Sequence, residues 1–98
     1  MDNFQNVAVA LARDYDFVAP VMARYADLVS EIGELGKELL LGSNYDAAEL
    51  QITNNTAEEV GDVIFALALL VNSLNLNLDE CFDAAISKYK SRWKNGQK

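Results

Sequence analysis

The 98-residue chain contains no histidine. This absence excludes a histidine general base, the Ser-His-Asp and Cys-His nucleophile pairs, and zinc sites with histidine ligands. The single cysteine, Cys81, cannot form a disulfide within the chain. Any chemistry must therefore depend mainly on carboxylates, lysines and arginines.

Basic residues are few as well, because 8 Lys+Arg face 15 Asp+Glu and give a formal net charge of -7. Such a chain lacks the basic surface that binds nucleic-acid phosphates or anionic lipid. The longest fully apolar run, residues 63–71, is about half as long as a membrane-crossing helix. The N-terminus lacks the basic region of a secretory signal. We therefore expect a soluble cytoplasmic protein with no nucleic-acid or membrane partner.

Proline and glycine are also scarce, with one and five residues, and long stretches are rich in Ala, Leu and Glu. This composition predicts an all-α fold. We expect a four-helix bundle-like single domain over residues 1–98, with helices near residues 3–15, 20–41, 56–74 and 77–93. A chain this short buries only roughly 60–65% of its unfolded surface, and 51% of its residues are hydrophobic. We therefore expect a homodimer or a dimer of dimers.

Local signals predict how the helices end and which faces pack. Pro20 suits the first turn of the second helix, and Gly42 suits its C-terminal stop. Thr56 and Glu59 have the spacing of a capping box and predict the start of the third helix. Residues 63–71 are apolar on every face, which places the third helix at the centre. Apolar stripes are expected on the first helix, at Phe4, Val7 and Leu11, and on the second, at Leu28, Ile32, Leu35 and Leu39.

Four acids share a narrow stripe of the second helix, within an arc of roughly 60°; they are Asp27, Glu31, Glu34 and Glu38. Like charges at i,i+4 destabilise a helix by a few tenths of a kcal/mol per pair, so the stripe is unfavourable unless a cation occupies it. The third helix repeats the pattern with Glu59 and Asp62. Antiparallel helices about 8–10 Å apart can bring four such carboxylates around one point.

Carboxylate oxygens alone favour a hard cation, Mg²⁺ first and Mn²⁺ next. A solvated helical face is the ordinary alternative, and a lone E-x-x-E would favour it. The conjunction of E-x-x-E and E-x-x-D on consecutive helices, each beside apolar residues, favours a metal site.

These residues resemble a known family. The segments Glu31-Ile32-Gly33-Glu34 and Glu59-Val60-Gly61-Asp62 are similar to the E-x-x-E…E-x-x-D signature of the MazG-like nucleoside triphosphate pyrophosphohydrolases, part of the all-α NTP pyrophosphatase superfamily. Lys88-Tyr89-Lys90-Ser91-Arg92 matches a K-Y-x-x-R element near the end of small members. The resemblance spans about residues 28–93.

The resemblance implies a Mg²⁺-dependent helical dimer, or dimer of dimers, that hydrolyses a nucleoside triphosphate to the monophosphate and pyrophosphate. It implies four metal ligands, namely Glu31, Glu34, Glu59 and Asp62, and two phosphate-binding residues, Lys88 and Arg92. The corresponding hypothesis is metal-activated attack of water on the α-phosphorus, with Glu34 or Glu38 as the catalytic base.

The sequence also allows other functions. A dUTP or dCTP pyrophosphatase, or a phosphoribosyl-ATP pyrophosphatase, would keep the fold and change the substrate. A non-catalytic helical interaction module could instead bind a basic partner, since Ser30 stands where many members carry Glu. Four aromatic residues can stack on a base, although helical aromatics more often belong to a core or interface; they are Tyr45, Phe65, Tyr89 and Trp93.

Overall fold

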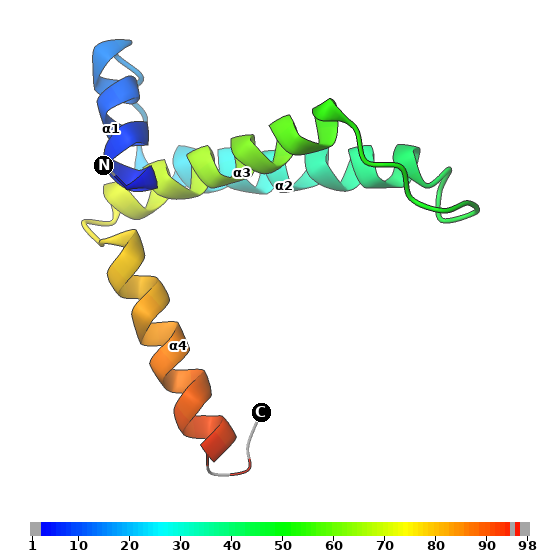
Figure 1. Cartoon of the computed structure of the whole chain (residues 1–98). Helices are drawn as coiled ribbons and strands as arrows, with labels where there is room; N and C mark the ends of the chain where they lie inside the picture. Colours follow the sequence, from blue (N-terminus) through cyan, green and yellow to red (C-terminus); the bar gives the residue numbers. More distant parts are fainter. Residues whose placement is uncertain (1–2, 95, 97–98) are drawn as a thin grey trace.

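The computed structural model describes residues 3–94 and 96. This part of the chain contains helices and no strand, which confirms the all-α class (Figure 1). The helices are α1 (Phe4–Asp14), α2 (Val21–Gly42), α3 (Asn54–Ser73) and α4 (Leu78–Lys94). None of the helices in these residues is by itself long and apolar enough to cross a membrane.

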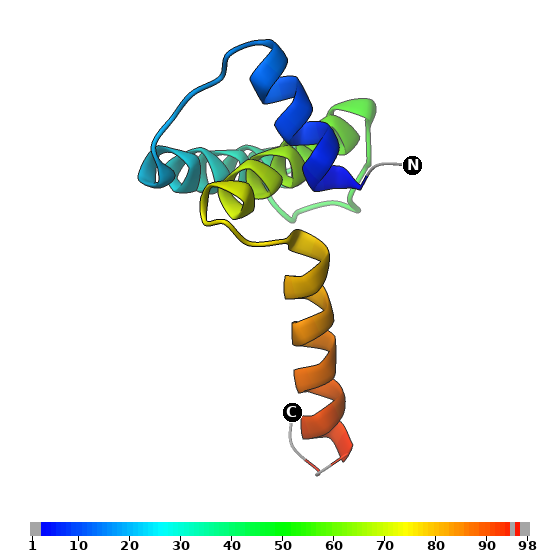
Figure 2. The same ribbon diagram turned by 90° about the vertical axis from the view of Figure 1, so that its left-hand side faces the viewer.

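Helices α2 and α3 lie side by side, and α1 packs across α3 near the end that leads to α4 (Figures 1 and 2). Helix α4 meets α3 at 97° and runs away from the other three. The radius of gyration is 16.5 Å, against about 13 Å for a compact chain of this length. The packed part of one chain therefore consists of α1 to α3, with α4 extending from it.

The core lies where α1 crosses α3. Its buried members are mostly alanines, whose small side chains let the two helices approach closely, and they are Ala8, Ala12, Ala68 and Leu69. The face of α1 that carries Phe4, Val7 and Leu11 is exposed instead, with Phe4 67% accessible. The bulky apolar stripe expected on α1 therefore does not contribute to the core of the single chain.

Helix α3 is central, as predicted, because it contacts both α1 and α2. Its burial is confined to part of its circumference, since Ala66, Ala68 and Leu69 are buried whereas Ile64 remains 36% accessible. On α2 no residue is fully buried, and Ile32 of its expected apolar stripe is 51% accessible. Much apolar surface on these two helices is therefore left uncovered within one chain.

The capping box that begins α3 is one turn earlier than predicted. The Thr53 side chain accepts a hydrogen bond from the Thr56 backbone N–H, at 3.4 Å, and the Thr56 hydroxyl accepts one from the Thr53 N–H, at 3.2 Å. The prediction that Thr56 caps the helix with Glu59 as its partner is wrong, because Thr56 itself occupies the third helical position. The Glu59 carboxylate is consequently available for another role.

The sequence predicts that Gly42 terminates the second helix just after its last residue. Gly42 is instead the last residue of α2, and Ser43 follows as the C-cap. A Cβ on Gly42 would lie 2.7 Å from the backbone oxygen of Gln51. The glycine therefore permits the returning loop to approach closely. The left-handed conformations that turn the chain belong to the next residues, Asn44, Tyr45 and Asp46.

The side chain of Gln5 on α1 fixes the joint between α3 and α4. Its Nε2 donates to the carbonyl oxygen of Leu76 at 2.8 Å, and its Oε1 accepts from the backbone N–H of Leu78 at 2.6 Å. Asn77 caps α4 by accepting from the Glu80 N–H at 3.0 Å, as its spacing predicted. The start of α4 is thus tied to α1 as well as to α3.

Candidate metal centre

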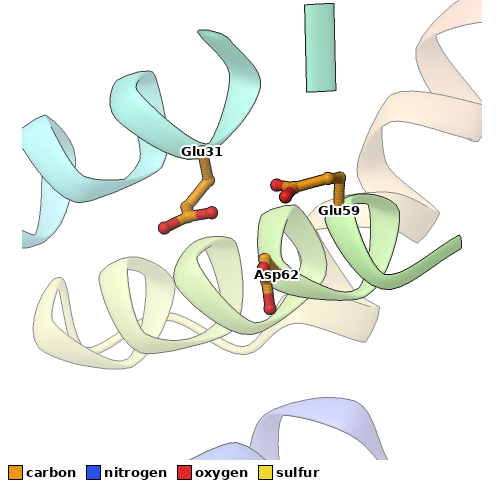
Figure 3. Close-up of side chains that lie close together, drawn as sticks. All are labelled: Glu31, Glu59 and Asp62. Carbon is orange, nitrogen blue, oxygen red and sulfur yellow. The ribbon is translucent and has the colours of Figure 1, made fainter. Parts of the chain in front are cut away.

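Three acids converge between α2 and α3. Glu31 extends from α2 toward α3, where Glu59 extends toward it and Asp62 lies one turn further along (Figure 3). One carboxylate oxygen from each of the three lies within 4.8 Å of the others. Glu31 and Glu59 are partly buried, whereas Asp62 is exposed.

Glu59 is the electrostatically unfavourable member of this acidic cluster, defined as Glu31, Glu59 and Asp62. Its Oε2 atom is buried, with no hydrogen-bond partner among the described residues. Burial raises the pKa of Glu59, and the neighbouring charges, chiefly those of Asp62 and Glu31, raise it further. A buried carboxylate of this kind is normally protonated or paired with a cation.

The donor set fits a hard divalent cation. All three groups offer oxygen atoms, which Mg²⁺ and Mn²⁺ prefer. Three carboxylates also leave positions for water and for phosphate oxygens in the six-coordinate geometry that Mg²⁺ requires. The unpaired Glu59 oxygen is the atom that such an ion would satisfy.

Glu34 and Glu38 lie at the edge of the acidic cluster. Neither belongs to the group of mutually close oxygens in the described residues. Their charges nevertheless contribute to raising the pKa of Glu59, after those of Asp62 and Glu31. Three of the four predicted metal ligands are therefore brought together, while the roles of Glu34 and Glu38 remain predictions.

Lys88 and Arg92 are carried by α4, which leads away from the acidic cluster (Figure 1). Both cations lie near the ring of Tyr89, with Lys88 Nζ 4.8 Å and Arg92 Cζ 6.0 Å from its centroid. Their predicted contact with substrate phosphates stays a prediction.

A cavity of about 640 Å³ adjoins the acidic cluster. Glu31 and Asp62 line it together with Phe65 of α3, and so do Phe17 and Arg24, which sequence reasoning missed. The sequence did contain a signal for Arg24, because it precedes Asp27 and Glu31 at the spacing i, i+3 and i+7. This spacing places all three on one face of a helix. Phe17 precedes α2, and no local pattern marks it.

Comparison with known proteins places the chain in a family. The model of the MazG nucleotide pyrophosphohydrolase domain matches residues 22–97. The uncharacterized protein YpjD of Bacillus subtilis is 35% identical over an alignment of 74 residues, and the match covers 72% of this chain and 65% of that relative. The match thus spans slightly under two-thirds of that relative's length.

The crystal structure of Bacillus subtilis YpjD, described there as a candidate pyrophosphatase, resembles this fold with a TM-score of 0.68 and 28% identity. The alignment covers 94% of this chain and 97% of that one. The extent of the family match and the likeness of the fold agree with the acidic motifs on α2 and α3. The chain belongs to the MazG nucleotide pyrophosphohydrolase family.

Proposed function

We propose that this protein is a divalent-metal-dependent pyrophosphohydrolase that converts a nucleoside triphosphate to the monophosphate and pyrophosphate. The observation that supports it best is the convergence of Glu31, Glu59 and Asp62, with one buried Glu59 oxygen unpaired. Family membership supplies the class of reaction. An acidic chain of net charge -7 can accept a triphosphate at this point only through local cations.

The acidic cluster would hold Mg²⁺, or Mn²⁺, between α2 and α3. When bound, the ion would neutralise phosphate charge, polarise the α-phosphate and lower the pKa of the attacking water. Glu34 and Glu38 follow Glu31 on the same stripe of α2 and are our candidates to accept the proton of that water, because a carboxylate outside the ligand set keeps its basicity.

Product analysis tests the proposal. The purified protein with Mg²⁺ should convert a panel of nucleoside triphosphates to monophosphate and pyrophosphate, and the preferred substrate separates a broad enzyme from a dUTP, dCTP or phosphoribosyl-ATP pyrophosphatase. Glu59→Gln and Asp62→Asn should each lower kcat/KM by at least about 100-fold. Glu58→Gln is the matched control, since this exposed neighbour lies outside the acidic cluster. Release of orthophosphate alone, or undiminished activity of both variants, would contradict the proposal.

Thermal unfolding separates the enzyme from a non-catalytic interaction module. A ligand that binds only the folded chain raises stability by RT ln(1 + [L]/Kd), or about 2.7 kcal/mol at 100 times Kd. The enzyme should therefore melt at a higher temperature with Mg²⁺, and Glu59→Gln should lose most of that gain. A module whose acidic stripe binds a basic partner would show no such gain.

We further propose that the chain functions as a homodimer or a dimer of dimers. Its accessible surface is 7538 Å², against about 5,500 Å² expected for a compact monomer of 10.8 kDa. The excess is of the size that stable subunit interfaces bury. An apolar stripe of α4 is part of it, with residues that are 36–72% accessible, namely Phe82, Ile86, Tyr89 and Trp93. Light scattering should find an oligomer, and Phe82→Asp should weaken it.

A second copy would also explain how Lys88 and Arg92 could contact substrate, although α4 leads away from the acidic cluster of its own chain. We propose that they bind substrate phosphates across the subunit interface. Two inactive variants, Glu59→Gln and Lys88→Gln, should then regain activity when mixed and allowed to exchange subunits, because some mixed sites are intact. If mixing never restores activity although subunits exchange, Lys88 does not act across the interface.

A further inference from the structure

The cavity beside the acidic cluster lies under the connection between α1 and α2. This connection forms an arc from the end of α1 to the start of α2 (Figure 2), and its Asp16, Phe17 and Val18 form part of the cavity wall. The volume of about 640 Å³ lies within the range of roughly 300–1,000 Å³ typical of small-molecule sites. Glu31 and Asp62 of the acidic cluster line the cavity, so a ligand held by a metal ion at that cluster would extend into it.

One face of α2 indicates the direction in which a metal-bound ligand would lie in the cavity. Arg24, Asp27 and Glu31 all line the cavity and follow one another on a single helix face. Seven residues of helix separate Arg24 from Glu31, which corresponds to about 10 Å along the axis. A nucleotide with its phosphates at Glu31 would thus place its nucleoside part toward Arg24.

The cavity lining other than its acids suits an aromatic base. Phe17 and Phe65, with the aliphatic Val18 and Leu69, supply apolar surface on which a base can stack. The Arg24 guanidinium donates to the backbone carbonyl of Phe17, which orients the side chain along the cavity wall. A guanidinium has five N–H donors and no acceptor, so further donors can face a ligand.

We propose that this cavity binds the nucleoside part of the substrate and that Arg24 selects bases with a ring carbonyl oxygen over adenine. The inference rests on the proposed pyrophosphohydrolase function and names the determinant of its specificity. Guanine, cytosine, uracil and thymine each present a carbonyl oxygen, which has two lone pairs and can accept from the guanidinium fork. Adenine has no carbonyl oxygen; its acceptors are single-lone-pair ring nitrogens, and its exocyclic group is an amino donor that would oppose an N–H group facing it.

Ratios of kcat/KM test this proposal, because a loosened fold lowers activity toward every base alike. The wild-type protein should prefer dGTP, dCTP or dTTP to dATP. Arg24→Gln should reduce that preference about 10- to 100-fold, as expected for loss of one hydrogen bond to a charged group. Arg24→Lys retains the charge but lacks the planar fork of donors, and it should reduce the preference too.

Arg13→Gln is the matched control, since Arg13 is exposed, lies beside Asp14 at 3.9 Å and does not line this cavity. It should leave the preference unchanged. A wild-type preference for dATP, or equal losses for all four nucleotides in Arg24→Gln, would overturn the proposal.

Binding of the monophosphates by calorimetry separates this inference from the proposed function, since it requires no hydrolysis. The wild-type protein should bind dGMP more tightly than dAMP, and Arg24→Gln should lose that difference. If no triphosphate is hydrolysed while this binding pattern is found, the proposed function fails and the cavity assignment stands. If triphosphates are hydrolysed but Arg24→Gln binds both monophosphates as the wild type does, Arg24 is not the determinant.

Discussion

Replacing Gln5 by methionine should destabilise the chain more than its small change in shape suggests. Gln5 is 7% accessible and bonds the Leu76 carbonyl at 2.8 Å and the Leu78 N–H at 2.6 Å. Methionine is similarly unbranched and has a similar helix propensity. The substitution therefore removes both hydrogen bonds while disturbing α1 little.

The magnitude follows from the two bonds. A neutral hydrogen bond contributes about 0.5–1.5 kcal/mol net, and a buried group left without a partner costs about 1–3 kcal/mol. Leu76 is 50% accessible, so water can reach its freed carbonyl, and the net contributions of the two bonds give an expected loss of about 1–3 kcal/mol in the free energy of unfolding. For a domain of this size that loss lowers the melting temperature by about 4–24 °C.

Urea unfolding followed by circular dichroism measures this loss directly. Gln51→Met is the matched control, because Gln51 is exposed in the loop between α2 and α3, and it should change the midpoint little. Equal midpoints for Gln5→Met and Gln51→Met would refute the assignment of Gln5 as the residue that ties α4 to α1.

Two further predictions concern stability. Because the pKa of Glu59 is raised by burial and by the acids around it, its protonated form stabilises the metal-free fold at acidic pH, and this stability is lost as the pH rises through the raised pKa. Glu59→Gln should therefore melt above the wild type without metal, by a margin that grows as the pH rises from the usual glutamate range through the raised pKa and is constant above it; a margin that does not change with pH would contradict this electrostatic explanation. Gly42→Ala should cost about 1–3 kcal/mol, because its Cβ would lie 2.7 Å from Gln51 O. Gly36→Ala, which meets nothing within 4 Å, should be neutral or stabilise by up to about 1 kcal/mol; equal midpoints for the two alanine variants in urea would refute the close approach.

The helices and the acidic motifs could be predicted because they depend on local spacing. Residues one turn apart share a helix face in any fold, so Glu31 and the pair Glu59 and Asp62 could be placed on acidic faces of their helices. Which acids of those faces meet depends on how α2 and α3 pack, and Glu34 lies outside the group of close oxygens. Which apolar faces pack within one chain depends on long-range contacts. On α1 the alanine face is buried and Phe4 is exposed. Both faces are apolar, and the periodicity of the sequence does not indicate which of them is buried within the chain.

The position of α4 and the cavity beside the α1–α2 connection could not be predicted from local sequence patterns either, because both depend on long-range contacts. The direction of α4 depends on Gln5, a polar residue that bonds partners more than seventy positions away. Phe17 enters the cavity wall because the chain turns at Asp16, whose φ is 58°. Asp tolerates this conformation better than most residues, but the turn alone does not indicate what lies beneath it.

The most direct test of the account is hydrolysis in ¹⁸O-labelled water with Mg²⁺. Attack of water on the α-phosphorus at the acidic cluster should place the label in the nucleoside monophosphate, and Glu59→Gln should form that labelled product at least about 100-fold more slowly. Label in pyrophosphate or orthophosphate instead, or labelled monophosphate formed by Glu59→Gln at the wild-type rate, would contradict it.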